Sequence, residues 1–355
     1  MPRLAPYAEL HRAPRGPGDA RPTATQIVKD QGLVASPEWT GRVVLITGCS
    51  PGGLGPEVAK AIHLTGADVF ITVRDVAKGN QVAQEILSDG KPGKAEVIQM
   101  DLASLESIRA GAREFLQKSG NKLNALINNA GVMACPQAKT KDGFELQLGT
   151  NHLGHFYLFH LVKNALIASA SPSFNSRVVS LSSAGHRYGK INFDDLNFEH
   201  TEYNPFTAYN QSKLATAYFA NEVDRIYQSR SIRALSVHPG GIITPLSRYL
   251  PSTKEVEEHP EISKLLQNPA QGASTTVWAA VAKELEGKGG IYLDEDAEAE
   301  QTPPDSPTYS GGYGENTYNS EAEKKLWIES LKLVSLSRLL KPTQCQEPNN
   351  PSGAY

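Results

Sequence analysis

The 355-residue sequence is poor in cysteine and has no long apolar run. Its three cysteines, Cys49, Cys135 and Cys345, are odd in number and far apart, so they supply neither a disulfide framework nor a paired zinc-ligand spacing. No stretch reaches the roughly 18 to 20 uncharged apolar residues that a membrane span requires. Four prolines within residues 1–17 interrupt the N-terminus before any apolar run of signal-peptide length. These absences favour a cytoplasmic protein without a membrane-spanning segment.

An excess of one charge sign is also lacking. The chain carries 35 Lys and Arg against 38 Asp and Glu, which gives a formal net charge of −3. The bulk electrostatics that draw a protein to nucleic acid or to an anionic membrane are therefore absent. A polyanion is excluded as the main partner, and a small-molecule substrate remains. The sequence leaves open whether the chain forms a homo-oligomer.

From about residue 41 onward, short β-branched runs alternate with amphipathic stretches. This alternation is typical of right-handed βαβ units on a parallel sheet. We predict an α/β fold with a single doubly wound, Rossmann-like parallel sheet and helices on both faces. Strands are expected over residues 42–47, 67–73, 95–100, 123–127, 177–181, 232–237 and 290–293, and the longest helices over 144–166 and 209–227.

The flanking segments differ in composition from this core. Residues 1–36 are rich in Pro, Arg and Gly and predict an extended N-terminal arm outside a single domain over 37–335. Within the domain, the Pro-rich, charged stretch 244–268 is expected to be a flap over the substrate pocket. Residues 294–320 predict a mobile loop and 336–355 a disordered tail, because such compositions bury little apolar surface.

A Gly-rich turn over residues 47–55 (TGCSPGGLG) joins the first strand to the first helix of the core. Glycines at this place let the backbone approach a pyrophosphate, which the free N–H groups of the helix N-terminus then bind. Residues 48–52 also spell G-x-S-x-G, the nucleophile elbow of serine hydrolases, with Ser50 as the nucleophile. That alternative lacks one donor of its oxyanion hole, because Pro51 has no N–H, and the loss is worth about 3 kcal/mol.

Further motifs follow in order along the chain. Tyr209 and Lys213 form YxxxK, residues 128–131 read NNAG, and residues 239–244 read PGxxxT. Together with the Gly-rich turn, these motifs resemble the short-chain dehydrogenase/reductase family over about residues 40–335. The segments that resemble its retinol-dehydrogenase-like and WW-domain-oxidoreductase-like branch, particularly the fungal members, are 74–79, 142–156 and 182–186.

The resemblance implies an NADP(H)-dependent oxidoreductase that transfers a hydride between the nicotinamide and a carbonyl or alcohol group of a lipophilic small molecule. Fungal members of this branch often serve secondary metabolism, and by analogy this chain is expected to do so. A non-catalytic protein that senses NADP(H) is the alternative within the same fold. One departure concerns the family turn TGxxxGxG, because here an extra residue separates Gly48 from the Gly53-Leu54-Gly55 end.

The proposed proton exchanger is Tyr209. A free tyrosine has a pKa near ~10, and a proton exchanger works best near the operating pH, so the pKa has to fall by about 2 to 3 units. Residues four apart share one face of a helix, which brings the ammonium of Lys213 close to the phenol. A neighbouring opposite charge lowers a pKa by roughly 1 to 3 units. Taken alone, such a Tyr and Lys pair is more often a solvated surface contact.

The resemblance assigns two further catalytic residues. Ser183 is expected to hydrogen-bond the substrate oxygen and Tyr209, whereas its alternative role is that of a strand-end cap. Asn151 is expected to hold a water that links Lys213 to solvent, and its alternative role is that of a core amide bonded to the backbone.

Four more polar residues lie near these positions. His152 and His155 lack a third ligand for a metal and are interpreted as packing residues. His186 and Tyr188 line the substrate pocket in one interpretation and are bystanders in the other.

The expected cofactor contacts run along the carboxyl edge of the sheet. Arg74, at the end of the second strand, favours the 2′-phosphate of NADP, although Asp75 follows it. By resemblance, adenine, its ribose and the nicotinamide carboxamide are contacted after the third, fourth and sixth strands, and the active-site Tyr209 and Lys213 also touch the cofactor. The full cofactor set is Gly48, Ser50, Gly53, Leu54, Gly55, Arg74, Asp101, Leu102, Asn129, Ala130, Gly131, Tyr209, Lys213, Ile242 and Thr244.

Overall fold

The computed structural model describes residues 3–250, 252–307 and 309–336 and contains one eight-stranded sheet in the order β10-β9-β6-β5-β4-β1-β2-β3. Every neighbouring pair is parallel except β9 and β10, and the order reverses between β1 and β4. The predicted doubly wound parallel sheet is confirmed. The strands are β1 (Val43–Thr47), β2 (Asp68–Val73), β3 (Ala95–Gln99), β4 (Ala125–Asn128), β5 (Ser176–Leu181), β6 (Ile232–Val237), β9 (Ile291–Asp294) and β10 (Ala297–Glu298).

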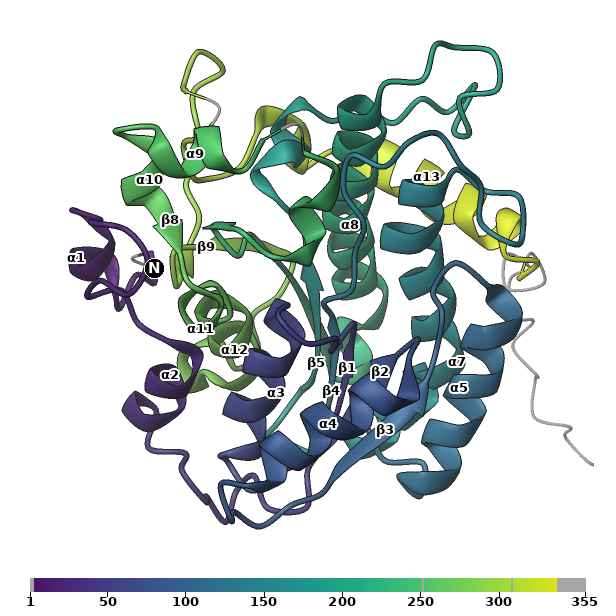
Figure 1. Cartoon of the computed structure of the whole chain (residues 1–355). Helices are drawn as coiled ribbons and strands as arrows, with labels where there is room; N and C mark the ends of the chain where they lie inside the picture. Colours follow the sequence, from purple (N-terminus) through teal and green to yellow (C-terminus); the bar gives the residue numbers. More distant parts are fainter. Residues whose placement is uncertain (1–2, 251, 308, 337–355) are drawn as a thin grey trace, which may run out of the picture.

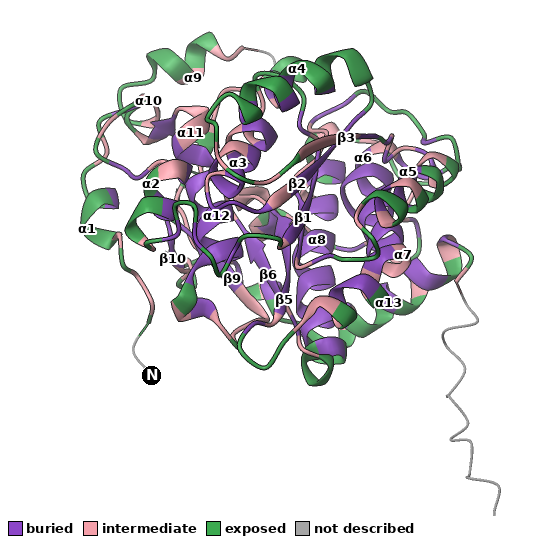
Figure 2. Cartoon of the chain, turned by 90° about the horizontal axis from the view of Figure 1, so that it is seen from below, coloured by how far each residue is buried: buried purple, intermediate pink, exposed green. Residues whose placement is uncertain are grey.

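Helices cover both faces of the sheet (Figure 1). One buried cluster joins the sheet to α2 (Ala24–Asp30), α3, α4 and α12, and a second joins it to α5, α7 (Gly154–Ser169), α8 and α13. Figure 2 shows the strands buried between these layers, with the exposed residues on the outer sides of the helices. The bounds are α3 (Leu54–His63), α4 (Val76–Leu87), α5 (Leu105–Lys118), α8 (Pro205–Tyr227), α11 (Pro269–Gly272), α12 (Ser274–Val281) and α13 (Ser320–Leu333).

The helix predicted over residues 144–166 is divided in the structure. It consists of α6 (Leu146–Leu148), a π-helical turn η1 (Gly149–Leu153) and α7 (Gly154–Ser169). Gly149 begins the π turn and Gly154 follows it, and both pack closely: a Cβ on Gly149 would lie 2.4 Å from Thr140 Cγ2, and one on Gly154 would lie 2.7 Å from the carbonyl oxygen of Leu102. Short π segments inside helices often mark functional sites, and Asn151 lies in this one.

The N-terminal arm is helical in part, which the prediction of an extended arm over residues 1–36 missed. It forms α1 (Ala8–His11) and α2 (Ala24–Asp30), and α2 packs against α12 and α3. Ile27 and Val28 are fully buried in the core. Because α2 has only seven residues, its helical spacing of apolar residues repeats too few times to be recognised next to the Pro- and Gly-rich stretch before it.

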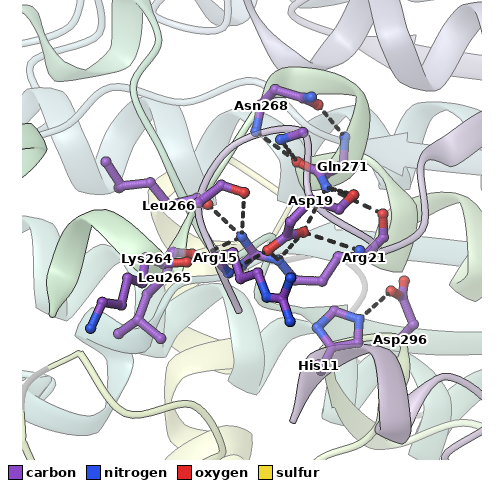
Figure 3. A network of polar contacts seen from close by, with 12 residues as sticks. His11, Arg15, Asp19, Arg21, Lys264, Leu265, Leu266, Asn268, Gln271 and Asp296 are labelled. Carbon is purple, nitrogen blue, oxygen red and sulfur yellow. Dashed lines mark hydrogen bonds and ion pairs between the residues drawn. The ribbon is translucent and has the colours of Figure 1, made fainter. Parts of the chain in front are cut away.

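Arg21 anchors this arm to the domain (Figure 3). Its side chain is 4% exposed and pairs with Asp19 at 2.9 Å. The same guanidinium donates to the carbonyl oxygens of Lys264, Leu265 and Leu266, at 3.3, 2.8 and 2.6 Å. These carbonyls lie at the C-terminal end of α10 (Ile262–Leu265), where no further helical turn satisfies them.

We expect Arg21→Met to lower the free energy of unfolding by about 3 kcal/mol, because it removes the charged partner of Asp19 and the guanidinium donor of three carbonyls. Denaturant unfolding measures the change. The matched control is Arg12→Met, whose partner Glu9 and whose own side chain are about three-quarters exposed, and we expect a change below about 1 kcal/mol there. Equal effects of the two substitutions would contradict the anchoring role.

The two segments predicted as a flap and a mobile loop both contain regular structure. Residues 244–268 form a 3₁₀ turn η4 (Pro245–Tyr249), α9 (Lys254–Glu258), α10 and β8 (Leu266–Gln267), and β8 pairs with β7 (Gly241–Ile242). Residues 294–320 begin with the end of β9 and include β10 and a 3₁₀ turn η6 (Glu315–Thr317). Asp294, Asp296 and Thr317 in this segment are buried, so the acidic composition did not reveal its packing.

Three further 3₁₀ turns complete the described secondary structure: η2 (Ala184–Tyr188), η3 (Gln228–Arg230) and η5 (Lys283–Leu285). Apart from Leu336, the tail predicted for residues 336–355 lies outside the described residues. Among the residues that are described, no helix combines the length and the apolar character needed to cross a membrane.

Candidate active site

The Gly-rich turn brings β1, α3 and the NNAG segment into close contact. Gly48 has φ +73°, and a Cβ on it would lie 2.7 Å from the Cα of Ala130. A Cβ on Gly55 would lie 2.6 Å from the carbonyl oxygen of Gly48. Only glycine permits both approaches, in keeping with the role of the glycines in dinucleotide-binding turns.

The extra residue of this turn is accommodated on its exposed side. Ser50, Pro51 and Gly52 are exposed, while Gly53 is the N-cap of α3 and the helix begins at Leu54. Gly53 has no side chain that could cap the helix. The first N–H groups of the ten-residue α3 therefore face the turn without a side-chain cap from the N-cap residue. The helix thus begins directly after the glycines, and the N-terminus of α3 suits an anion.

The same geometry speaks against a nucleophile elbow. Such an elbow places its serine at the strained position of the strand-to-helix turn. In this turn the positive φ values belong to Gly48 (+73°) and Gly52 (+79°), not to Ser50.

Thr47, at the end of β1, connects the Gly-rich turn with the NNAG segment. Its Oγ1 accepts hydrogen bonds from the backbone N–H groups of Asn129 and Ala130, both at 3.0 Å. The Asn129 side-chain amide donates to the carbonyl oxygen of Thr47 at 2.7 Å. Asn129, the predicted ribose contact, thus holds the turn with both its backbone N–H and its side-chain amide.

His155 continues this network to Asn151. Its Nε2 lies 2.8 Å from Thr47 Oγ1, and its Nδ1 lies 3.0 Å from the carbonyl oxygen of Asn151. A carbonyl only accepts, so Nδ1 carries the proton and Nε2 accepts from the threonine hydroxyl. Burial lowers the pKa of His155 to about 4, which keeps the ring neutral. His155, interpreted from the sequence as a packing residue, is a bridge between the turn and the π-helical segment.

The Asn151 side chain is held by the backbone of Val132 and by Ser212. Oδ1 accepts from the Val132 N–H at 2.9 Å, and Nδ2 donates to the Val132 carbonyl and to Ser212 Oγ, also at 2.9 Å. A Cβ on Gly131 would lie 3.3 Å from Asn151 Oδ1 and 3.7 Å from Lys213 Nζ. Asn151 therefore lies beside Lys213 with both of its amide hydrogens occupied.

Tyr209, Lys213 and Ser183 meet at the carboxyl ends of β5 and β6. Lys213 Nζ lies 5.7 Å from the centre of the Tyr209 ring and donates to the carbonyl oxygen of Leu181 at 2.7 Å. Ser183 hydrogen-bonds to Tyr209 through its side chain and accepts from the Gly185 N–H at 3.2 Å. Ser182, the neighbouring serine, instead donates to the carbonyl oxygen of Lys213 at 2.8 Å.

The ionisation of this pair differs from the prediction. Burial raises the pKa of Tyr209 to about 12, although the Ser183 hydrogen bond opposes the rise. Burial also lowers the pKa of Lys213 to about 8. The expected fall in the pKa of Tyr209 is therefore wrong for the protein alone, because Tyr209 and Lys213 are both removed from water.

Arg74 and Asp75 follow β2 directly, and their side chains have different surroundings. Arg74 is exposed. The carboxylate of Asp75 caps α4 by accepting from the N–H groups of Ala77 and Lys78 at 3.0 and 3.3 Å. On the next strand, the Asp101 carboxylate accepts from its neighbour Ala103 N–H at 3.1 Å. The acid beside Arg74 is thus engaged locally, while the guanidinium faces solvent.

The remaining predicted cofactor contacts lie close to the same edge. A Cβ on Gly272 would lie 2.4 Å from Ile242 Cγ1 and 3.2 Å from Leu54 Cδ2. The side chains of Ile242 on β7 and Leu54 on α3 therefore both pack against Gly272 of α11. Thr244 caps η4 by accepting from the Leu246 N–H at 3.2 Å. Leu102 is buried against Gly154 at the start of α7.

The other histidines of this region have structural partners. His152 Nε2 lies 2.8 Å from Ser330 Oγ on α13, and His186 is fully buried. Tyr188 is 49% exposed and borders a cavity of roughly 610 Å³ that residues 302–304, 314–316, 318 and 319 also line. Within the described part of the chain, no group of three His, Cys, Asp or Glu side chains is arranged to hold a metal ion.

Comparison with known proteins identifies the chain as an oxidoreductase. The family model described as short chain dehydrogenase matches residues 42–255. The chain therefore belongs to the short-chain dehydrogenase/reductase family, in agreement with the resemblance of its motifs.

Individual relatives support the same family. The chain is 45% identical over 333 residues to short-chain dehydrogenase/reductase prx1 of Penicillium roqueforti, covering 93% of this chain and 95% of that protein. It is 41% identical over 257 residues to retinol dehydrogenase 12 of Mus musculus, covering 72% and 78%. Among solved structures, an uncharacterised protein from Mycobacterium paratuberculosis superposes with a TM-score of 0.63 at 32% identity, covering 84% of this chain and 97% of that one. The branch with fungal and retinol-dehydrogenase members is thus confirmed.

Proposed function

We propose that the protein is an NADP(H)-dependent reductase or dehydrogenase of a lipophilic carbonyl or alcohol, with Tyr209 as the proton donor or acceptor. The observation that carries the proposal is the convergence of Tyr209, Lys213, Ser183 and Asn151 at the carboxyl edge of the sheet. The phenol hydrogen-bonds to Ser183 and lies 5.7 Å, ring centre to Nζ, from Lys213. A substrate oxygen placed between Ser183 and Tyr209 would receive one hydrogen bond from each.

The residues that would bind the cofactor fit a dinucleotide. The uncapped N-terminus of α3 and the glycines before it offer N–H groups to a pyrophosphate. The exposed Arg74 offers a guanidinium to the 2′-phosphate of NADP, and Asp75 is engaged in capping α4. The nicotinamide would supply the hydride acceptor or donor, and its oxidised form a positive charge near Tyr209. Our proposal of NADP over NAD rests on Arg74 and Asp75.

The roles proposed for the four polar side chains follow from their contacts. Tyr209 exchanges the proton with the substrate oxygen, and Ser183 fixes that oxygen. Lys213 contributes its positive charge beneath the phenol, and its Nζ is anchored by Leu181. Asn151 holds the loop after β4 against this lysine through Val132. Water bridging from Asn151 to solvent remains our prediction.

A lipophilic substrate is our inference from exposed aromatic residues and from one relative. Phe206 lies three residues before Tyr209 on α8 and is 48% exposed, and Tyr249, in the segment predicted as a substrate flap, is 45% exposed. Exposed aromatic side chains offer apolar contact surface to a ligand. Retinol dehydrogenase 12 is named for a lipophilic alcohol, which agrees with this class. The cytoplasm is the proposed setting, in keeping with Cys49 and Cys135 as buried free thiols.

The pH dependence of carbonyl reduction tests the proposed charge states. With its pKa near 12, Tyr209 keeps the proton that reduction consumes. Lys213, with its pKa near 8, is charged below that pH and neutral above it. We expect kcat/KM for reduction to be constant below about pH 7 and to fall about tenfold per pH unit above about pH 8. A profile that is flat to about pH 10 would contradict this assignment, and the residual activity of Lys213→Arg should lack the fall, because arginine stays charged.

The function itself is tested by incubating the protein with NADPH and a panel of apolar ketones and aldehydes while following the absorbance of NADPH. Turnover of at least one carbonyl supports the proposal. Tight NADPH binding without turnover of any compound would favour a sensor instead. Ester hydrolysis that needs no cofactor and is lost in Ser50→Ala would favour the hydrolase.

A further inference from the structure

Buried His186 lies between Ser183 and residues 314–317, which we call the C-terminal segment. It belongs to η2, the 3₁₀ turn that Ser183 caps, and it is fully buried. Its Nδ1 lies 2.5 Å from the carbonyl oxygen of Ser183. On the other side of the ring, Nε2 lies 3.0 Å from Thr317 Oγ1 and 3.3 Å from the backbone nitrogen of Gly314.

These partners fix the tautomer of His186 from both sides. The carbonyl of Ser183 only accepts, so Nδ1 carries a hydrogen. The N–H of Gly314 only donates, so Nε2 carries none, and the hydroxyl of Thr317 donates to the same nitrogen. The ring is therefore neutral and Nδ1-protonated. Burial, which lowers the pKa of His186 to about 3, keeps it in this form at neutral pH.

Tyr292 on β9 approaches the same carbonyl from the sheet. Its hydroxyl donates to the carbonyl oxygen of Ser183 at 3.1 Å, and its ring centre lies 4.3 Å from that of His186. The side chain is 1% exposed. Burial raises the pKa of Tyr292 well above its usual value, so the hydroxyl keeps the hydrogen that it donates.

The carbonyl of Ser183 thus receives three donors: the backbone N–H of His186 at 3.0 Å, its Nδ1–H and the Tyr292 hydroxyl. A carbonyl has two lone pairs, so this acceptor is saturated. Fixing the carbonyl also fixes the rotation of the Ser183 backbone, which is extended at φ −170° and ψ 159°. The backbone rotation sets the direction of the Ser183 Cα–Cβ bond, and the Gly185 N–H, which donates to Ser183 Oγ at 3.2 Å, holds the hydroxyl toward Tyr209.

We propose that His186 is a positioning residue for the reaction: its Nδ1–H holds the Ser183 carbonyl so that the Ser183 hydroxyl meets Tyr209 and the substrate oxygen, and Thr317 and Gly314 hold the ring in place. Tyr292 is the second side chain that donates to the Ser183 carbonyl. The C-terminal segment is in this way part of the active site. The inference rests on the proposed function, because it assigns His186 to the step that Tyr209 carries out.

Two substitutions test the roles of the two ring nitrogens of His186 separately. In His186→Asn, the side-chain amide reaches the position of Nδ1 and can donate to Ser183, but it does not reach Thr317. In His186→Gln, the amide reaches the position of Nε2 near Thr317 and Gly314 and leaves the Ser183 carbonyl without this donor. Because a displacement of about 1 Å at a reacting group costs up to about 100-fold in rate, we expect kcat to fall about 10- to 100-fold in His186→Gln. We expect a fall of less than about threefold in His186→Asn, with the KM for the carbonyl little changed in both.

The assay measures kcat and KM for a carbonyl that the wild type reduces, together with NADPH binding and the melting temperature. Rescue by Asn but not by Gln supports positioning through Nδ1. Equal losses in both variants, or an effect on KM alone, would overturn it. The ¹⁵N shifts of the His186 ring in the wild type give a readout that needs neither activity nor a variant: an Nε2-protonated ring would also overturn the inference. A wild type without turnover would count against the proposed function instead, and the ring spectrum would still decide the hydrogen-bond arrangement.

Discussion

Replacing Tyr209 with Phe is expected to lower kcat by about 1,000-fold, because it removes the only group that exchanges a proton with the substrate oxygen in this account. The ring and its packing on α8 are kept, and the hydrogen bond to Ser183 is lost. Steady-state kinetics with NADPH and a carbonyl measure the change. NADPH binding should be within about threefold of the wild type, since the substitution removes a single hydroxyl.

The matched control for this substitution is Tyr227→Phe. Tyr227 lies near the end of the same helix and is also buried, and its ring packs against Phe159 of α7 with ring centres 5.3 Å apart. Removing its hydroxyl should change stability by at most about 1 kcal/mol and leave kcat within a few-fold. Turnover that survives in Tyr209→Phe at the level of this control would refute the mechanism.

Replacing Arg74 with Ala is expected to weaken NADPH binding about 10- to 100-fold, because a charge-assisted hydrogen bond to a phosphate is worth roughly 1.5 to 3 kcal/mol. NADH lacks the 2′-phosphate, so its dissociation constant should change less than about threefold. Titration of protein fluorescence with each cofactor measures both constants.

Arg113→Ala controls for the loss of a positive charge as such, since Arg113 is an exposed residue of α5. It should leave both affinities unchanged within about twofold, because exposed charges are largely screened beyond a Debye length. An equal loss of NADPH and NADH affinity in Arg74→Ala would count against the assignment of NADP(H).

The sheet could be predicted because its signal is local. The β-branched run at Val43–Thr47 is buried throughout, as expected of a strand whose two faces are both covered by helices. The motifs at the strand ends were equally informative, since parallel strands bring their carboxyl ends to one edge. Ser183 could be placed at this edge for that reason, whereas Asn151, Tyr209 and Lys213 lie on helical elements and were assigned to the same site by the resemblance of their motifs.

The parts that escaped prediction depend on contacts between distant segments. The packing of α2 against α12 and α3, and of Thr317 against His186, joins residues that are far apart in sequence. The pKa of Tyr209 depends on burial, which the YxxxK spacing does not report. The sequence did contain one signal for the contact between His155 and Asn151. His155 lies four positions after Asn151, so its ring can reach the carbonyl of Asn151 along the helix.

The central claim is that this chain transfers a hydride to a carbonyl with Tyr209 supplying the proton. NADPH that carries deuterium at C4 of the nicotinamide tests it most directly, with the alcohol product analysed by mass spectrometry. The account predicts deuterium on the carbinol carbon of the product from the wild type and a rate of label transfer about 1,000-fold lower in Tyr209→Phe. Bound NADPH whose deuterium never reaches a product, or label transfer at an equal rate in the two proteins, would contradict it.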